Sequence, residues 1–194
     1  MSKEDIIDFF DDLAPQWDED MVRNDSVINE ILDYADITQG KMVLDVACGT
    51  GVLFPYYMER NVKKITGVDI SKKMIEIAKT KFKDSDIELI NSDIEEVSLI
   101  NKYDCCMVYN AFPHFFNRKK LLECLAEKII RGGRLTIAHG MSREKVNRHH
   151  SGSASKVSMK LMSANELAEL FKPLFDVDVI VSDKMKYVVS GIKR

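Results

Sequence analysis

The sequence predicts a doubly wound α/β fold, in which helices cover both faces of a mostly parallel sheet. From residue 41 onward, short apolar runs alternate with amphipathic stretches of helical periodicity. The runs are almost continuously apolar, which is typical of strands buried on both faces. Near the end of the chain, only residues 182–185 separate two strand-like runs, and this spacing predicts an antiparallel hairpin at the end of the sheet.

The part of the chain before this alternation is expected to be helical. Residues 3–38 predict two helices, because apolar side chains recur there at helical spacing, with a break near Pro15 and Trp17. The first five strands are then expected at the apolar runs 42–47, 65–68, 87–90, 105–109 and 135–138.

Helices are expected between these strands. The three segments lie near residues 51–60, 71–83 and 117–130. Ser71 and Asn117 have the position and chemistry of N-caps, and Gly132-Gly133 fits a helix stop after the third segment.

The last part of the chain contains a helix and the hairpin. The helix begins at Ser163, which has capping-box spacing to Glu166, and it ends before Pro173. The hairpin strands are expected at 175–181 and 186–192.

Residues 140–160, between the fifth strand and the last helix, are polar and rich in Lys, Arg and His. So long a polar connection in an ordered domain favours a lid or an acceptor-binding segment over a mobile surface loop. Arg143, Asn147, Arg148 and the histidines of this segment could contact an anionic or polar substrate.

Composition limits the class of protein. The chain has 194 residues, which is room for one domain, and its net charge of −3 argues against a dedicated nucleic-acid binder. No apolar run approaches the ~20 residues that span a bilayer, and the acidic N-terminus lacks the pattern of a signal peptide. Four cysteines form no C-x-x-C pair, so we expect a reduced, cytoplasmic protein.

The most informative segment is VLDVACGTG, residues 43–51. A buried strand leads into Ala47-Cys48-Gly49-Thr50-Gly51, where small residues let a ligand approach the backbone and its amide groups. Asp69 ends the next strand, where a carboxylate can accept hydrogen bonds from both hydroxyls of a ribose. The two features together predict a nucleoside site at the carboxyl edge of the sheet.

The loop does not match two common nucleotide fingerprints. The third glycine of a dinucleotide motif would fall at Phe54, which is followed by Pro55. A Walker motif is also excluded, because no Gly-Lys-Ser/Thr follows the loop. A dehydrogenase therefore remains only as a less favoured alternative.

These motifs resemble those of the class I S-adenosylmethionine-dependent methyltransferases, of the UbiE-like small-molecule type, over nearly the whole chain. The segments that carry the resemblance are FFDDLAPQWDE, VLDVACGTG, GVDIS, NSDIEEV, YDCCMVYNAFPHF and RGGRLTIAH. The resemblance implies a Rossmann-like sheet of order 3-2-1-4-5-7-6 with strand 7 antiparallel. It also implies one methyltransferase domain over 1–194, with a helical lid at 1–38, a core at 41–194 and a substrate loop at 140–160.

The resemblance also implies roles for single residues in binding S-adenosylmethionine. Asp69 is expected to hold the ribose, Asp93 the adenine amino group, and Trp17 to lie against the methionine part; Asp93 could equally be an ordinary N-cap. Asp45 lies inside an apolar strand, and it would anchor the ammonium group directly or through water, brace the glycine loop or only cap neighbouring amides. The complete set expected to bind the cofactor is Trp17, Asp45, Ala47, Gly49, Gly51, Asp69, Ile70, Met74, Asp93, Ile94 and Asn110.

The four histidines are expected on the reactive side, because they follow the fourth and fifth strands. In one interpretation a histidine, above all His114 but also His139 or His150, removes a proton from the acceptor. In another, two or three of His114, His139, His149 and His150 hold a divalent metal, although no H-x-x-x-H spacing supports a preformed site. A scatter of exposed loop histidines is the third interpretation.

The expected reaction is an in-line transfer of the methyl group to a small-molecule nucleophile. YNAF stands after the fourth strand in place of the N-P-P-Y or D-P-P-Y motif that selects planar amino groups in this family. We therefore expect no nucleic-acid and no membrane partner, in a monomer or homodimer. The alternative function is a protein that binds or senses S-adenosylmethionine without catalysis.

Overall fold

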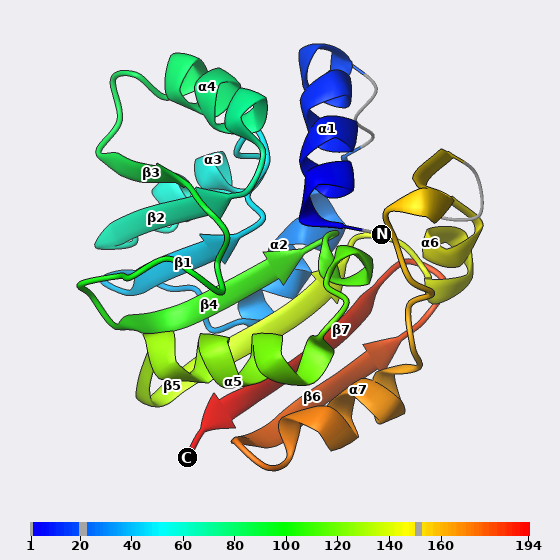
Figure 1. Ribbon diagram of the computed structural model, residues 1–194. Helices are drawn as coiled ribbons and strands as arrows, with labels where there is room; N and C mark the ends of the chain where they lie inside the picture. The colour runs from blue at the N-terminus through cyan, green and yellow to red at the C-terminus, as the bar shows by residue number, and fades with distance from the viewer. Residues whose placement is uncertain (1, 20–22, 150–152) are drawn as a thin grey trace.

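The computed structural model describes residues 2–19, 23–149 and 153–194. Within them, seven strands form one sheet of order β3-β2-β1-β4-β5-β7-β6, as shown in Figure 1. The strands are β1 (Met42–Val46), β2 (Lys64–Asp69), β3 (Ile87–Asn91), β4 (Tyr103–Tyr109), β5 (Ile129–His139), β6 (Phe175–Ser182) and β7 (Tyr187–Lys193). β7 is antiparallel to both β5 and β6, and the other neighbours are parallel. The predicted order and the antiparallel seventh strand are confirmed.

The helices also follow the sequence pattern in most places. They are α1 (Lys3–Leu13), α2 (Asp25–Tyr34), α3 (Phe54–Glu59), α4 (Lys72–Lys81), α5 (Arg118–Lys128), α6 (Arg143–His149) and α7 (Ala164–Phe171), with 3₁₀ turns η1 (Ala14–Gln16), η2 (Phe112–His114) and η3 (Ser153–Lys156). Ser71 and Asn117 accept backbone N–H bonds as N-caps, and Ser163 forms the predicted capping box with Glu166.

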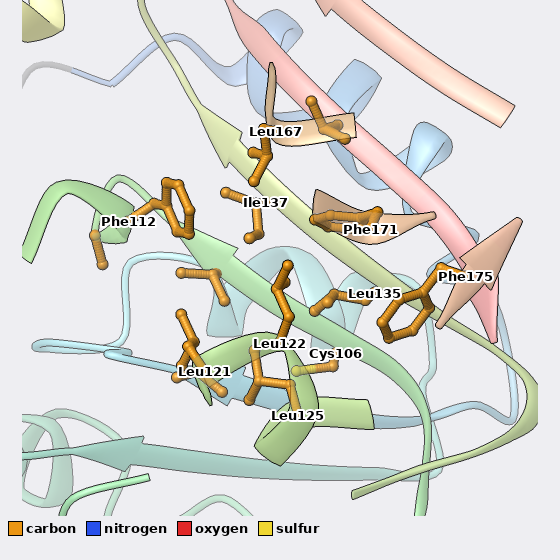
Figure 2. Close-up of a cluster of buried hydrophobic side chains, with 14 of the residues drawn as sticks. Cys106, Phe112, Leu121, Leu122, Leu125, Leu135, Ile137, Leu167, Phe171 and Phe175 are labelled. Carbon is orange, nitrogen blue, oxygen red and sulfur yellow. The ribbon is translucent and has the colours of Figure 1, made fainter. Parts of the chain in front are cut away.

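Two apolar clusters hold the layers together, one on each face of the sheet. α5 and α7 cover one face, where the leucines of α5 point toward Phe171, Leu135 and Ile137 (Figure 2). α2, α3 and α4 cover the other face, with Ile31 and Tyr57 among the fully buried side chains. Burying one such side chain stabilises the fold by roughly 1.5–3 kcal/mol.

α1 stands beyond the carboxyl ends of the central strands and packs against α4 (Figure 1). This places the first helix over the edge of the sheet where the glycine loop lies, and not against either apolar face. The arrangement agrees with the lid that the resemblance implies.

The helix stop predicted at Gly132-Gly133 is wrong. α5 ends at Lys128 and β5 begins at once with Ile129, so both glycines belong to an irregular part of the strand. Its pairing with β4 shifts register there, and Gly132 has φ +78°. A side chain on Gly133 would come within 2.8 Å of the Asp104 carbonyl oxygen, so the glycines serve a bulge in the sheet.

Candidate functional site

A cavity of about 610 Å³ opens at the carboxyl ends of the central strands. Its volume lies in the range of small-molecule sites. Of the residues predicted for the site, its lining contains Trp17, Ala47, Gly49, Asp69, Ile70, Met74, Asp93, Ile94, Asn110, His114, His139 and His149. Asp45 and Gly51 are not part of the lining, and His150 lies outside the described residues.

The glycine loop brings its backbone to the cavity through three left-handed residues. Ala47, Gly49 and Gly51 have φ of +55°, +56° and +86°. Only the first two line the cavity, so the direct cofactor contact expected of Gly51 is not supported. A side chain on Gly51 would lie 2.5 Å from the Phe54 ring, so this glycine is needed for the packing of α3. Phe54 stands where a dinucleotide motif has its third glycine, and its ring is fully buried against the glycine loop.

Asp69 joins the glycine loop to the end of β2. Its Oδ2 accepts a hydrogen bond from the Gly49 amide at 2.8 Å, and its Oδ1 accepts one from the Ser71 amide at 2.8 Å. Burial raises the pKa of Asp69 to about 6, although both amides favour the ionised form. Each carboxylate oxygen retains a second lone pair, so the group can accept two further donors from a ligand in the cavity.

Asp45 lies behind the loop. Its side chain is buried, and Tyr57 of α3 donates a hydrogen bond to its Oδ2 at 3.2 Å. Burial raises the pKa of Asp45 to about 8, so the carboxyl holds its proton at neutral pH. Asp45 is not part of the cavity lining, so the geometry favours the expected bracing of the glycine loop over a direct contact with a ligand ammonium.

The far end of the cavity is closed by an ion pair that the sequence reasoning missed. Asp93 accepts the Glu95 amide at 2.8 Å, as an N-cap would, and its other oxygen pairs with Lys3 of α1. Lys3 also contacts Glu96 at 2.8 Å, and these partners hold the pKa of Lys3 well above its usual range. The expected adenine contact of Asp93 would therefore share this carboxylate with Lys3.

Two more carboxylates fasten the N-terminal segment over the cavity. Asp11 accepts hydrogen bonds from the Ser71 hydroxyl at 2.5 Å and from the Lys73 amide at 3.2 Å, at the start of α4. Asp18 accepts the Thr50 hydroxyl at 2.6 Å and pairs with Lys81 at 2.7 Å. In the sequence these acids resemble those of a solvated helix face, so no local signal distinguishes them from acids that contact only water.

The other half of the cavity is formed after β4 and β5. His114 lies edge-on to Phe10 of α1, with ring centroids 4.9 Å apart, and its Nδ1 is 2.9 Å from the Val157 carbonyl oxygen. Since a carbonyl only accepts, this contact assigns a proton to Nδ1. His139 at the end of β5 and His149 on α6 also line the cavity.

These histidines are brought to one cavity, as the sequence predicts for the reactive side. Among the described residues, however, no three His, Cys, Asp or Glu side chains are arranged to hold a metal ion. The metal interpretation therefore gains no support from the geometry.

The segment 140–160 contains α6 and η3 rather than an open loop. Two of its residues that were expected to contact substrate bind the backbone of Leu161 instead. Arg143 donates to the Leu161 carbonyl at 3.0 Å, and Asn147 accepts the Leu161 amide at 2.7 Å. The Met159 amide in turn donates to the Pro113 carbonyl at 2.8 Å. The strip from Val157 to Leu161 is thereby fixed against His114.

Asn110 follows β4 with φ +56°, a conformation that is uncommon outside glycine and occurs often at functional sites. Its Oδ1 accepts the Gly140 amide at 3.0 Å, which joins the ends of β4 and β5. Tyr109 and Phe116 line the cavity. Phe112 does not, because it is fully buried beneath the Arg118 guanidinium, 5.2 Å from its ring centre.

Comparison with known proteins agrees with this geometry. A family model described as a methyltransferase domain matches residues 43–133. The malonyl-[acyl-carrier protein] O-methyltransferase of Acetivibrio thermocellus is 39% identical over 92 residues, which are 46% of this chain and 32% of that protein. The ubiquinone/menaquinone biosynthesis C-methyltransferase UbiE of Campylobacter jejuni is 27% identical over 166 residues, covering 74% of this chain and 66% of the relative.

Among solved structures, magnesium protoporphyrin IX methyltransferase of Synechocystis PCC 6803 with bound S-adenosylhomocysteine superposes with a TM-score of 0.75. The two chains share 16% identity, and each is covered to 99%. This likeness concerns the fold.

The sheet order and the loop-bounded cavity define a Rossmann-like methyltransferase fold. The family model covers residues 43–133, and together with the relatives it makes this part of the chain similar to methyltransferase domains. The chain spans only about a third of the length of the Acetivibrio relative. Among the described residues, every helix is too short or too polar to cross a membrane.

Proposed function

We propose that the protein binds S-adenosylmethionine and transfers its methyl group to a small-molecule acceptor. The observation that carries this proposal is the Asp69 carboxylate, held by the Gly49 amide at 2.8 Å in the wall of a 610 Å³ cavity. A nucleoside at this point would meet a fixed hydrogen-bond acceptor and exposed loop backbone together.

The residues around Asp69 fit the proposed cofactor. Asp69 would accept the ribose hydroxyls through its remaining lone pairs. Met74, Ile70 and Ile94 offer apolar contacts on either side of the base, and Asp93 offers an acceptor at its edge. Trp17 approaches the glycine loop closely, because a side chain on Gly49 would meet its Nε1 at 3.8 Å. Trp17 would thus cover the methionine part.

When bound, S-adenosylmethionine supplies an activated methyl group on a positively charged sulfur. The chain's own contribution is then to orient the acceptor, exclude water and hold its proton. Orientation of two reactants can supply up to ~7–11 kcal/mol of the barrier. Phe10, Phe116 and Tyr109 form apolar walls toward the acceptor half and would exclude water there.

His114 would serve as the general base. Its Nδ1 is engaged by the Val157 carbonyl, so the basic Nε2 would accept the proton of an acceptor hydroxyl, thiol or amine. A base in this role typically contributes about 10²–10⁴-fold in rate. His139 and His149 line the same half of the cavity and would contribute to acceptor binding.

The test combines binding with chemistry. Isothermal titration calorimetry is expected to detect saturable binding of S-adenosylmethionine and of its demethylated product. A metabolite extract incubated with isotopically labelled methyl donor should then yield a labelled product, which mass spectrometry identifies. Binding without any labelled product would favour the non-catalytic alternative, and no binding to folded protein would end the proposal.

A matched pair of variants tests whether S-adenosylmethionine binds at Asp69. Asp69→Asn removes the charge on the expected ribose contact, so affinity for S-adenosylmethionine should fall roughly 10- to 100-fold, the value of a hydrogen bond to a charged group. Asp86→Asn removes an exposed carboxylate near the amino end of β3 and should bind as the native protein does.

A further inference from the structure

We infer that the methyl acceptor is an anion with an apolar body, such as an aromatic carboxylate, phosphate or ionised phenol. This inference rests on the proposed function, because it concerns the half of the cavity that the cofactor would leave open. It is carried by the way in which charge and apolar surface are divided along the cavity.

The ionisable side chains of the lining fall into two groups. The carboxylates Asp69, Asp93 and Glu95 all follow β2 or β3, at the end assigned to the cofactor. After β4 and β5 and on α6, the described lining carries histidines and no carboxylate. A cationic acceptor would therefore meet no opposite charge in its half of the cavity.

Two cations lie at or near the cavity. Arg23 lines the cavity. Lys145 is exposed and precedes His149 by four residues on α6, so it lies on the same helix face as His149, which lines the cavity.

The surrounding segments extend the same asymmetry. Residues 140–160 contain five Lys or Arg and one Glu, although the whole chain has a net charge of −3. Residues 2–19, which contribute Lys3 and Trp17 to the cofactor half and Phe10 to the histidine half, contain seven Asp or Glu and one Lys. In Figure 1, α1 and α6 stand on either side of the same edge of the sheet. Such a division of charge would steer a cationic cofactor and an anionic acceptor to different halves.

The histidine half also requires an apolar body. Its walls include Phe10, Phe115, Phe116, Met141 and Val146, and only a few polar groups project between them. A small hydrophilic anion would leave most of this surface uncovered, whereas a ring or acyl chain that carries one anionic group would bury it.

A pair of fluorescent probes separates charge from shape. 8-anilinonaphthalene-1-sulfonate and N-phenyl-1-naphthylamine share their aromatic rings, and only the first carries a sulfonate. Trp17 is the one tryptophan of the chain and lines the cavity, so energy transfer from it reports probe bound there. At pH 7.5 and low salt, we expect the anionic probe to bind about tenfold more tightly than the neutral one.

Matched double variants locate the preference. In the Arg23→Gln, Lys145→Gln variant, the anionic preference should fall to about twofold, as it should for native protein in high salt. The Lys63→Gln, Arg131→Gln variant loses the same charges at exposed sites near the amino ends of β2 and β5, and it should keep the full preference.

Three results would overturn the inference: equal or tighter binding of the neutral probe, a preference that survives in the Arg23→Gln, Lys145→Gln variant, or failure of the anionic probe to bind near Trp17. None of them depends on methyl transfer. Failure of the proposed function is recognised separately, as the loss of calorimetric binding of S-adenosylhomocysteine.

Discussion

Ala47 holds a left-handed backbone, φ +55°, where β1 enters the glycine loop. An L-residue with a Cβ pays a steric cost of about 1 kcal/mol in this region that glycine avoids. We therefore expect Ala47→Gly to raise the free energy of unfolding by up to about 1 kcal/mol, measured by urea denaturation. Ala78→Gly, inside α4, should lower it by about 1 kcal/mol or more. A lower free energy of unfolding for Ala47→Gly would show that the left-handed backbone at Ala47 carries no such steric cost.

Asp45 makes the stability of the fold depend on pH. Its pKa is raised to about 8 in the folded state, against 3.8 for an ordinary Asp, so between pH 4 and pH 8 the folded state binds a proton that the unfolded state has released. The free energy of unfolding therefore falls as pH rises through this window, by up to about 1.4 kcal/mol per unit.

Asp45→Asn should remove that dependence, because the amide oxygen keeps the Tyr57 hydrogen bond and does not ionise. Urea denaturation from pH 5 to pH 9 is expected to show the variant gaining on the native protein as pH rises. Asp69 contributes a slope of the same sign near pH 4–6 to both proteins, so their difference isolates Asp45. Parallel curves for the two proteins would refute the buried, protonated carboxyl.

At the scale of elements, we expect α1 to act as a lid that single carboxylates hold in place. Asp11 receives the Ser71 hydroxyl and the Lys73 amide at the start of α4, so removing it frees one helix from the other. We expect Asp11→Ala to release S-adenosylmethionine roughly tenfold or more faster, in stopped-flow traces of Trp17 fluorescence. The value follows from the loss of one or two hydrogen bonds to a charged group.

Asp8 provides the control on the same helix, because it is exposed and also acidic. Asp8→Ala should leave the release rate unchanged while altering the charge of α1 to the same extent. If both variants accelerate release equally, the effect would be one of general charge, and the contact with α4 would not hold the lid.

For the whole molecule, the sequence predicts the parts that depend on local pattern. The glycine loop, the Asp69 position and three of the four histidines follow from short motifs and from the rule that ligands bind at the carboxyl edge, and the sheet order follows from the family resemblance that these motifs carry. What escaped prediction depends on distant pairs: Lys3 meets Asp93 and Asp11 meets Ser71 across 60 or more residues. Nothing in the acidic pattern of α1 distinguishes these acids from solvated ones.

One mistaken detail has its origin in tertiary packing. Gly132-Gly133 reads locally as a helix stop, but the adjacent strand β4 requires a bulge there. For Asp45 the local pattern leaves several roles open, and the hydrogen bond from Tyr57 of α3 favours bracing. In both cases a neighbouring element that the local window does not contain supplies the missing information.

The fold as a whole places two buried carboxyls, Asp45 of β1 and Asp69 of β2, beneath the end of the cavity assigned to a cationic cofactor. Both have raised pKa values in the free protein, of about 8 and about 6. A bound positive charge nearby favours their ionised forms, so binding should release protons. Affinity for S-adenosylmethionine is then expected to increase as pH rises from 6 to 8.

Calorimetry in buffers of different ionisation enthalpy measures the protons released. S-adenosylhomocysteine shares the adenosine part and lacks the sulfonium charge, so its affinity should change less with pH and its binding should release fewer protons. Asp45→Asn should reduce the proton release for S-adenosylmethionine, because one of the two titrating groups is gone. Equal proton release for both ligands would mean that the protonation of Asp45 and Asp69 does not respond to the charge on sulfur. These carboxyls would then contribute to binding through hydrogen bonds alone.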